Sequence, residues 1–242
     1  KQLNGAQQGL HNVNDAISMT QTAEGALQSV TAVAQRIITL ATQGANDTMS
    51  QDQRSAIVFE TDKLRTTIRD IAKRTKYTDT PLFNYSGNAV MNIQVSNQSN
   101  DTISVGATAL GPISVDATTA ATTAGTSLTT AGASTAGVTL DTKISAAVSA
   151  QTAKTLASSV FTEIQSAAAT YLNDIITQRG QLGAVQNQLE YTVSNLSEFS
   201  NNLAASRSRV MDTDYAAETA NLTKGQILQQ ASTAMLAQAN QM

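Results

Sequence analysis

The stretch IITQRGQLGAVQNQLEYTVSNLSEFSNNLAASRSRV, residues 175–210, carries the strongest periodic pattern in this 242-residue chain. Large apolar side chains recur in it every seven residues, at Ile175, Leu182, Leu189, Leu196, Leu203 and Val210. Val185 and Phe199 occupy the partner positions of the repeat. A seven-residue repeat sustained over this length is typical of a left-handed coiled coil. The pattern therefore predicts a rod helix over residues 161–214.

A second long helical pattern occupies residues 1 to about 43, where Leu3, Leu10 and Ile17 repeat by seven. About 45 helical residues span roughly 65–70 Å, so the two predicted helices have nearly equal length. We expect them to pair antiparallel, with the middle of the sequence as a cap and both termini at one end. After the polar break ATQGANDTMSQDQ (41–53), a shorter helix is predicted from the spacing of Ile57, Leu64, Ile68 and Ile71.

The period changes to two in MNIQVSNQSNDTISV, residues 91–105. Apolar and polar residues alternate on both sides of an Asn/Ser/Asp-rich centre, which predicts a β-hairpin with a turn of about five residues. The following tract, DATTAATTAGTSLTTAGASTAGVTLDTKISAAVSAQTAKTLASSV (116–160), has few large apolar side chains. We expect a weakly packed surface insertion or a flexible segment there, rather than a dedicated binding site.

The composition excludes several classes of protein. The chain has no cysteine, which excludes a disulfide scaffold and a thiolate metal site. Its net charge of −3 and pI near 5.1 argue against a nucleic-acid binder. It has no tryptophan and only 4% aromatic residues, so its core must be built from Leu, Ile, Val and Ala. No apolar run approaches the roughly 18 residues needed to span a bilayer.

Residues that carry out catalysis are scarce. His11 is the only histidine, so a two-histidine metal site is excluded, and no phosphate-binding glycine loop or GxSxG motif occurs. Gly180 and Gly183 lie inside the predicted long helix, where we expect them to permit the close approach of a neighbouring helix. Charged residues crowd one short segment, and we interpret them as salt-bridging or capping groups: Arg207, Arg209, Asp212, Asp214 and Glu218. The sequence thus predicts no catalytic site, no cofactor and no metal.

Two long motifs resemble one family. SNLSEFSNNLAASRSRVMDTDYAAETANLTKGQILQQASTAMLAQANQM (194–242) is similar to the C-terminal part of bacterial flagellin, with an SRSRxxDxDYAxE run followed by an ILQQA…LAQAN segment. NDAISMTQTAEGALQSVTAVAQRIITLATQGAND (14–47) resembles the N-terminal flagellin region, including TAEGAL. The resemblance covers about residues 1–105 and 165–242, and it leaves only the Thr/Ala-rich middle unmatched.

This resemblance implies a structural subunit that self-assembles into the flagellar filament for motility, and not an enzyme. The implied fold is mainly α with a small β part: an elongated antiparallel helical rod with a β-hairpin and a small inserted variable domain. The expected domains are the N-terminal part of the rod with the hairpin (1–105), the variable outer insertion (106–160), the C-terminal rod helix (161–214) and the start of the filament-core helix (215–242). The implied location is the extracellular filament, after export by the flagellar type III apparatus.

The resemblance also implies partners. These are other flagellin subunits, an export chaperone, a cap protein and an innate immune Toll-like receptor, with no nucleic acid and no membrane among them. An apolar stripe is expected to belong to the filament-core helix, whose partners are neighbouring subunits and N-terminal residues that this apparently truncated fragment lacks: Ile227, Leu228, Ala231, Met235 and Leu236. The last turns of the C-terminal helix are also expected to be missing.

The receptor-recognition surface of the family falls on Arg36, Leu40 and Glu60. Thr39 stands where many members have an acidic residue, and Ile38 stands where an arginine is frequent. An exposed arginine beside a leucine is a plausible hot spot, although an ordinary solvated helix face explains these residues almost equally well.

One alternative function is a flagellin-like cell-surface binding protein or adhesin with ligand contacts in the variable middle. The aromatic platforms and clustered carboxylates that are usual in sugar sites are absent from residues 106–160. We expect this middle segment to be the outermost and most modifiable part, with Ser and Thr residues open to O-linked sugars. We also expect that deletion of residues 116–160 leaves the rod folded.

Overall fold

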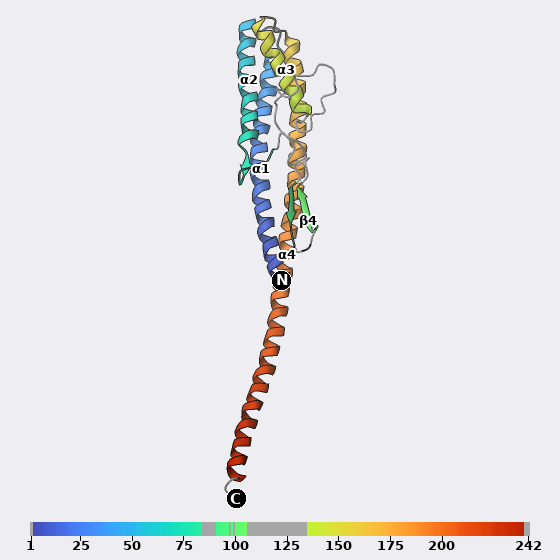
Figure 1. The fold of residues 1–242 in the computed structure, drawn as a ribbon. Coiled ribbons are helices and arrows are strands. Elements are labelled where there is room, and N and C mark those ends of the chain that lie inside the picture. The colour runs from blue at the N-terminus through green and yellow to red at the C-terminus, as the bar shows by residue number, and fades with distance from the viewer. Residues whose placement is uncertain (1, 84–90, 97, 99, 106–134, 240–242) are drawn as a thin grey trace.

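The computed structural model describes residues 2–83, 91–96, 98, 100–105 and 135–239. The helices in these ranges are α1 (Gln2–Gly44), α2 (Gln51–Arg74), α3 (Thr135–Thr152) and α4 (Ser158–Ala239). The strands form two antiparallel hairpins, β1 (Lys76–Tyr77) with β2 (Thr80–Pro81) and β3 (Met91–Gln94) with β4 (Thr102–Val105). Figure 1 shows the helices side by side in an elongated bundle, so the prediction of a mainly α rod with a small β part is confirmed.

The long helices α1 and α4 pair antiparallel, as predicted. Gly9 near the start of α1 lies against Leu196, and Gly44 at its end lies against Phe161 near the start of α4. The prediction that both termini share one end is wrong. Helix α4 has 82 residues, about 120 Å at 1.5 Å per residue, and it continues as a single helix beyond the start of α1 (Figure 1).

The seven-residue repeat forms the seam between these two helices. Ile175 and Leu182 belong to the larger core with α1, α2 and α3, whereas Leu189 and Leu196 belong to a second cluster with the start of α1 and the β3–β4 hairpin. Leu203 is half-buried, and Val210 is exposed. The repeat therefore predicts the buried seam correctly through Leu196. Beyond Leu203 the seam has ended, although the repeat continues to Val210.

Local sequence explains where α2 begins and ends. Ser50 accepts a hydrogen bond from the backbone N–H of Gln53, and the Gln53 side chain accepts one from the N–H of Ser50. This capping box satisfies two backbone donors that the first helical turn leaves without partners. Lys73 and Arg74 in the last turn complement the negative end of the helix dipole.

The β3–β4 hairpin confirms the prediction from the alternating pattern. Met91 pairs with Val105 and Ile93 with Ile103, and the Val95 N–H donates to the Asp101 carbonyl at 2.9 Å. Five positions of the sequence lie between these two bonded residues, which agrees with the predicted turn length. The hairpin is held against α1, because the Asn12 amide donates to the Gln94 carbonyl at 2.9 Å and Gly9 lets the backbones approach.

The expectation of a weakly packed insertion is wrong from Thr135 onward. Those residues form α3, which packs against both α2 and α4. Ala136, Leu140, Ile144 and Ala147 share one helical face and are buried in the larger core. Few large side chains are needed, because alanines allow close helix packing and Leu140 and Ile144 are fully enclosed. Residues 106–134, the rest of the expected insertion, lie outside the described residues.

One smaller expectation also needs correction. A Cβ added at Gly180 or Gly183 would meet nothing within 4 Å, so neither glycine permits close helix packing within this chain. The predicted boundary between residues 214 and 215 falls inside the continuous helix α4, so the division between rod helix and filament-core helix stays a prediction. Among the described residues, no helix is both long and apolar enough to cross a bilayer.

Candidate assembly surface

The C-terminal part of α4 exposes its large apolar side chains. Along the helix, the exposed fraction is 0% for Leu189 and 7% for Leu196, and it rises to 47% for Phe199 and 64% for Val210. More large apolar side chains that are at least half exposed follow toward the C-terminus, namely Leu222, Ile227, Leu228, Met235 and Leu236. The chain therefore offers a long apolar surface that its own described residues leave uncovered.

The predicted stripe lies on this surface. Ile227, Leu228, Ala231, Met235 and Leu236 lie within one half of the helix circumference, with Ile227 and Leu236 at its two edges, and all are exposed. We refer to these five residues as the tail stripe. Gln226 and Gln230 lie on the opposite side, so the tail is amphipathic. An amphipathic helix with an uncovered apolar side gains free energy when other helices cover that side.

The predicted receptor-recognition residues do not all reach the surface. The Arg36 guanidinium donates twice to Glu60 Oε1, from Nε at 2.9 Å and from Nη2 at 2.7 Å, and both side chains are about half exposed. The structure thus joins two of the candidates, one from α1 and one from α2. Leu40 is only 2% exposed and belongs to the larger core, so the expectation of Leu40 on that surface is wrong.

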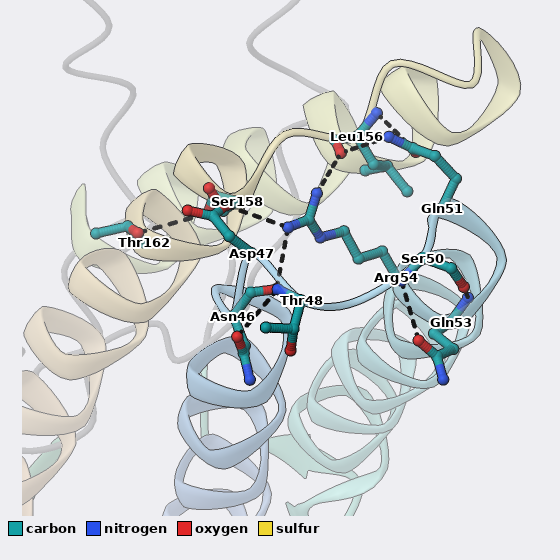
Figure 2. A network of polar contacts seen from close by, with 10 residues as sticks. All are labelled: Asn46, Asp47, Thr48, Ser50, Gln51, Gln53, Arg54, Leu156, Ser158 and Thr162. Carbon is teal, nitrogen blue, oxygen red and sulfur yellow. Dashed lines mark hydrogen bonds and ion pairs between the residues drawn. The ribbon is translucent and has the colours of Figure 1, made fainter.

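A polar cluster closes the end of the bundle that lies far from the tail. Figure 2 shows the buried Arg54 guanidinium between two loops. It donates to the Leu156 carbonyl at 3.1 Å and to the Asn46 carbonyl at 3.0 Å, and it pairs with Asp47 at 3.4 Å. Gln51 both donates to and accepts from the Leu156 backbone, at 2.9 and 3.2 Å. Helix α2 thereby joins the α1–α2 loop to the α3–α4 loop.

A second polar cluster fixes α3 against α2. Arg65 Nη1 lies 3.0 Å from Asp141 Oδ1 and 2.7 Å from Ser145 Oγ, and Arg65 Nη2 lies 2.6 Å from Asp62. Arg69 also approaches Asp141, at 3.4 Å. The Asp141 carboxylate is buried, so its charge needs these partners. Only one register of α3 places Asp141 between the two arginines.

The described residues offer little for catalysis. No group of three or more His, Asp or Glu side chains among them is arranged to hold a metal ion. Burial raises the pKa of Tyr171, and the charge of Asp174 raises it further, so this phenol stays protonated. His11 is exposed on α1. Arg207, Arg209 and Glu218 are exposed on α4, and the side chains of Asp212 and Asp214 lie outside the description.

Comparisons with known proteins decide the family. The model of the bacterial flagellin N-terminal helical region matches residues 1–89, and that of the C-terminal helical region matches residues 164–242. The chain is 36% identical to flagellin of Bacillus subtilis over 246 residues, which cover 99% of this chain and 79% of that protein. The chain belongs to the bacterial flagellin family. Flagellin B of Vibrio anguillarum is 30% identical, over 99% of this chain and 82% of the relative.

A solved flagellin has a similar fold. The crystal structure of Bacillus cereus flagellin aligns with a TM-score of 0.54 and 20% identity, over 81% of this chain and 94% of that chain. As a flagellin, the protein is a structural subunit of a self-polymerising filament that lies outside the cell. None of these comparisons favours the adhesin alternative.

Two features of this flagellin were missed from the sequence. Arg54 belongs to no recognisable motif, and one of the two loops that bury it, at Leu156, is 102 positions away in the chain. The α3 face was visible as a spacing of four, four and three from Ala136 to Ala147, but the Thr/Ala/Ser composition obscured it. A search for helical spacing of small residues would have found α3, whereas no local signal marks Arg54.

Proposed function

We propose that this flagellin enters its filament through the C-terminal part of α4, with the tail stripe packed against helices of neighbouring subunits. The single observation that carries this proposal is the rise in exposure along one unbroken helix, from Leu189 at the seam to Met235 and Leu236 in the tail. Full burial of a large apolar side chain contributes about 1.5–3 kcal/mol. Burial of the four large residues of the stripe would therefore contribute about 6–12 kcal/mol toward the cost of association.

The test is uptake of the chain by fragments of existing filaments, measured by co-sedimentation. Leu228→Asp places a charge in the tail stripe, and Gln230→Asp places the same charge on the opposite side of the same helix turn. We expect the first variant to lose uptake by about tenfold or more, and the second to retain it. Equal uptake of both variants would contradict the proposal. Circular dichroism checks that both variants remain helical.

Export by the flagellar type III apparatus, an export chaperone and a cap protein complete the proposed route. An uncovered tail stripe on the unassembled subunit is a surface that a chaperone would cover. The absence of cysteine suits passage through a narrow channel, because no disulfide has to be broken. Binding of the export chaperone should weaken in the Leu228→Asp variant and persist in Gln230→Asp, as isothermal titration would measure.

The Arg36–Glu60 pair is our proposed contact for an innate immune Toll-like receptor. It is an exposed pair that bridges α1 and α2 through two hydrogen bonds to one Glu60 oxygen. Arg36→Ala should lower receptor-reporter activation severalfold, whereas Arg74→Ala, on an exposed arginine of α2, should not. Equal responses would show that the pair only joins two helices. The proposed variable, modifiable outer segment concerns residues 106–134, which lie outside the described residues.

A further inference from the structure

We propose that Met235 is an oxidation-sensitive position, and that its conversion to methionine sulfoxide blocks addition of the subunit to the filament. The inference rests on the assembly surface proposed above. It adds a modification site on that surface and a class of reagent that acts on it, which is a hydroperoxide such as hydrogen peroxide.

The chain concentrates its accessible sulfur in the tail. It has six methionines, no cysteine and no tryptophan. Met19 is buried, and Met49 and Met91 are partly buried against the larger core. Met235 is 75% exposed, the only thioether so open among the methionine side chains that the structure describes. A peroxide in solution therefore reaches Met235 before it reaches the three methionines of the bundle.

The reaction needs no cofactor from the protein. The Met235 sulfur attacks one peroxide oxygen, the O–O bond breaks, and an S–O bond forms. The sulfur loses two electrons, the peroxide is reduced, and the second oxygen leaves as water after it takes a proton. The product has a polar sulfoxide oxygen in place of an apolar thioether.

The surroundings of Met235 make this change costly only on assembly. Ile227, Leu228, Ala231 and Leu236 have no side-chain hydrogen-bond donor, and the Ser232 hydroxyl beside Met235 already donates to the Leu228 carbonyl at 2.8 Å. The Gln238 amide is then the one side-chain donor three or four residues from Met235 that could reach the new oxygen. In the unassembled subunit the oxygen is hydrated, because the stripe is exposed. When a neighbouring subunit covers the stripe, that hydration is lost, and the apolar residues of the stripe do not replace it. The oxidant therefore prevents unassembled subunits from adding to the filament. In subunits that are already assembled, packing shields Met235 from oxidation.

The test compares wild type, Met235→Leu and Met235→Gln. Each chain is treated with hydrogen peroxide or buffer, quenched, and added to filament fragments, and uptake is measured by sedimentation. Peptide mass spectrometry reports the sulfoxide at each methionine. We expect peroxide to lower wild-type uptake about tenfold, a factor that corresponds to 1.4 kcal/mol of lost contact free energy. Met235→Leu should resist the treatment, and Met235→Gln should have low uptake without peroxide. A methionine sulfoxide reductase should restore uptake of the oxidised wild type.

The outcomes separate this inference from the proposed function. The inference is overturned if wild-type uptake stays unchanged while Met235 is oxidised. It is also overturned if peroxide lowers the uptake of Met235→Leu as much as that of the wild type. In both cases the proposed assembly surface stands. If Met19 is oxidised as fast as Met235, the exposure argument is overturned. If untreated Leu228→Asp is taken up like wild type, the assembly surface itself is wrong, and the inference fails with it.

Discussion

Residues 158–203 and 204–239 belong to one continuous helix, yet they use their apolar side chains differently. In the first part, Ile175, Leu182 and Leu189 are buried against α1 and its neighbours. In the second part, side chains of the same kind, such as Leu228 and Leu236, are exposed. The difference shows that an apolar helical pattern predicts that a face will be covered, but not whether the same chain covers it.

The comparison also concerns stability. The bundle part of α4 is held by two clusters of buried side chains, whereas no side chain that the structure describes in residues 204–239 belongs to either cluster. Isolated helices are marginally stable in water because their nucleation is costly. We therefore expect the tail to open at low free energy and the bundle to open only on global unfolding.

The largest expected effect comes from removing α3. Replacement of residues 135–157 by a short Gly/Ser linker removes Leu140, Ile144 and Leu156 from the larger core. It also removes the Leu156 carbonyl that Arg54 contacts and the Asp141 and Ser145 partners of Arg65. We expect loss of the cooperative thermal transition measured by circular dichroism. Deletion of residues 116–160, which the sequence predicted would leave the rod folded, should have the same result.

Truncation after residue 222 is the matched control for that deletion. It removes a segment of similar length from the exposed tail, where no described side chain is buried. Helical signal should fall only in proportion to the residues lost, and the melting temperature should stay within a few degrees. A large drop in melting temperature would show that the tail stabilises the bundle.

A point substitution applies the same comparison to one residue type. Leu189→Ala removes a fully buried side chain from the second cluster, and its expected cost is about 2–5 kcal/mol in the free energy of unfolding. Leu228→Ala makes the same chemical change in the tail and should alter the free energy of unfolding by less than about 0.5 kcal/mol. Urea denaturation measures both. Similar losses would mean that the tail folds back onto the bundle in solution.

The polar cluster between α2 and α3 should have a smaller effect. Asp141→Asn removes a buried charge that Arg65 and Arg69 approach, and we expect a loss of about 1.5–3 kcal/mol in unfolding free energy. The exposed pair of Lys143 and Glu163 is the control, and Lys143→Gln should cost less than about 1 kcal/mol. Equal losses for the two variants would contradict the inference that the contacts of Asp141 fix the register of α3.

Much of this architecture was predictable because it follows from periodic spacing. The repeat from Ile175 to Leu196 identified the seam, and the alternation around Ile93 and Ile103 identified the hairpin and its turn length. Both features come from regular spacing of apolar residues that recurs several times along the same segment. The tail stripe was predicted for the same reason.

The parts that could not be predicted depend on single contacts between distant segments. Arg54 is buried with its guanidinium hydrogen-bonded to the carbonyls of Leu156 and Asn46. No sequence pattern at these positions predicts the two contacts. Leu40 carries the same spacing as any core leucine, so only the packing decided between core and receptor surface. The family resemblance placed Leu40 on the surface, and the structure places it inside.

Glycines provide a further comparison, between the bundle seam and the outer side of α4. A Cβ at Gly9 would lie 1.8 Å from the Val95 carbonyl oxygen, so Gly9→Ala must displace the hairpin from α1. We expect a loss of about 1–3 kcal/mol in unfolding free energy. Hydrogen exchange should show faster opening of β3 and β4 in this variant. Unchanged exchange there would show that the hairpin adjusts without cost.

The smallest expected effect has the opposite sign and concerns Gly183. A Cβ at this position would meet nothing within 4 Å, and alanine is favoured over glycine inside a helix by roughly 0.8–1 kcal/mol. Gly183→Ala should therefore stabilise the unassembled chain by about 0.5–1 kcal/mol in urea denaturation. The same variant should be tested for uptake by filament fragments, because the open side of Gly183 is also where a helix of another subunit could approach closely. Higher stability with unchanged uptake would assign Gly183 no role in packing, whereas higher stability with reduced uptake would place a neighbouring subunit at this side of the rod. A loss of stability in the isolated chain would contradict the open environment on which both readings depend.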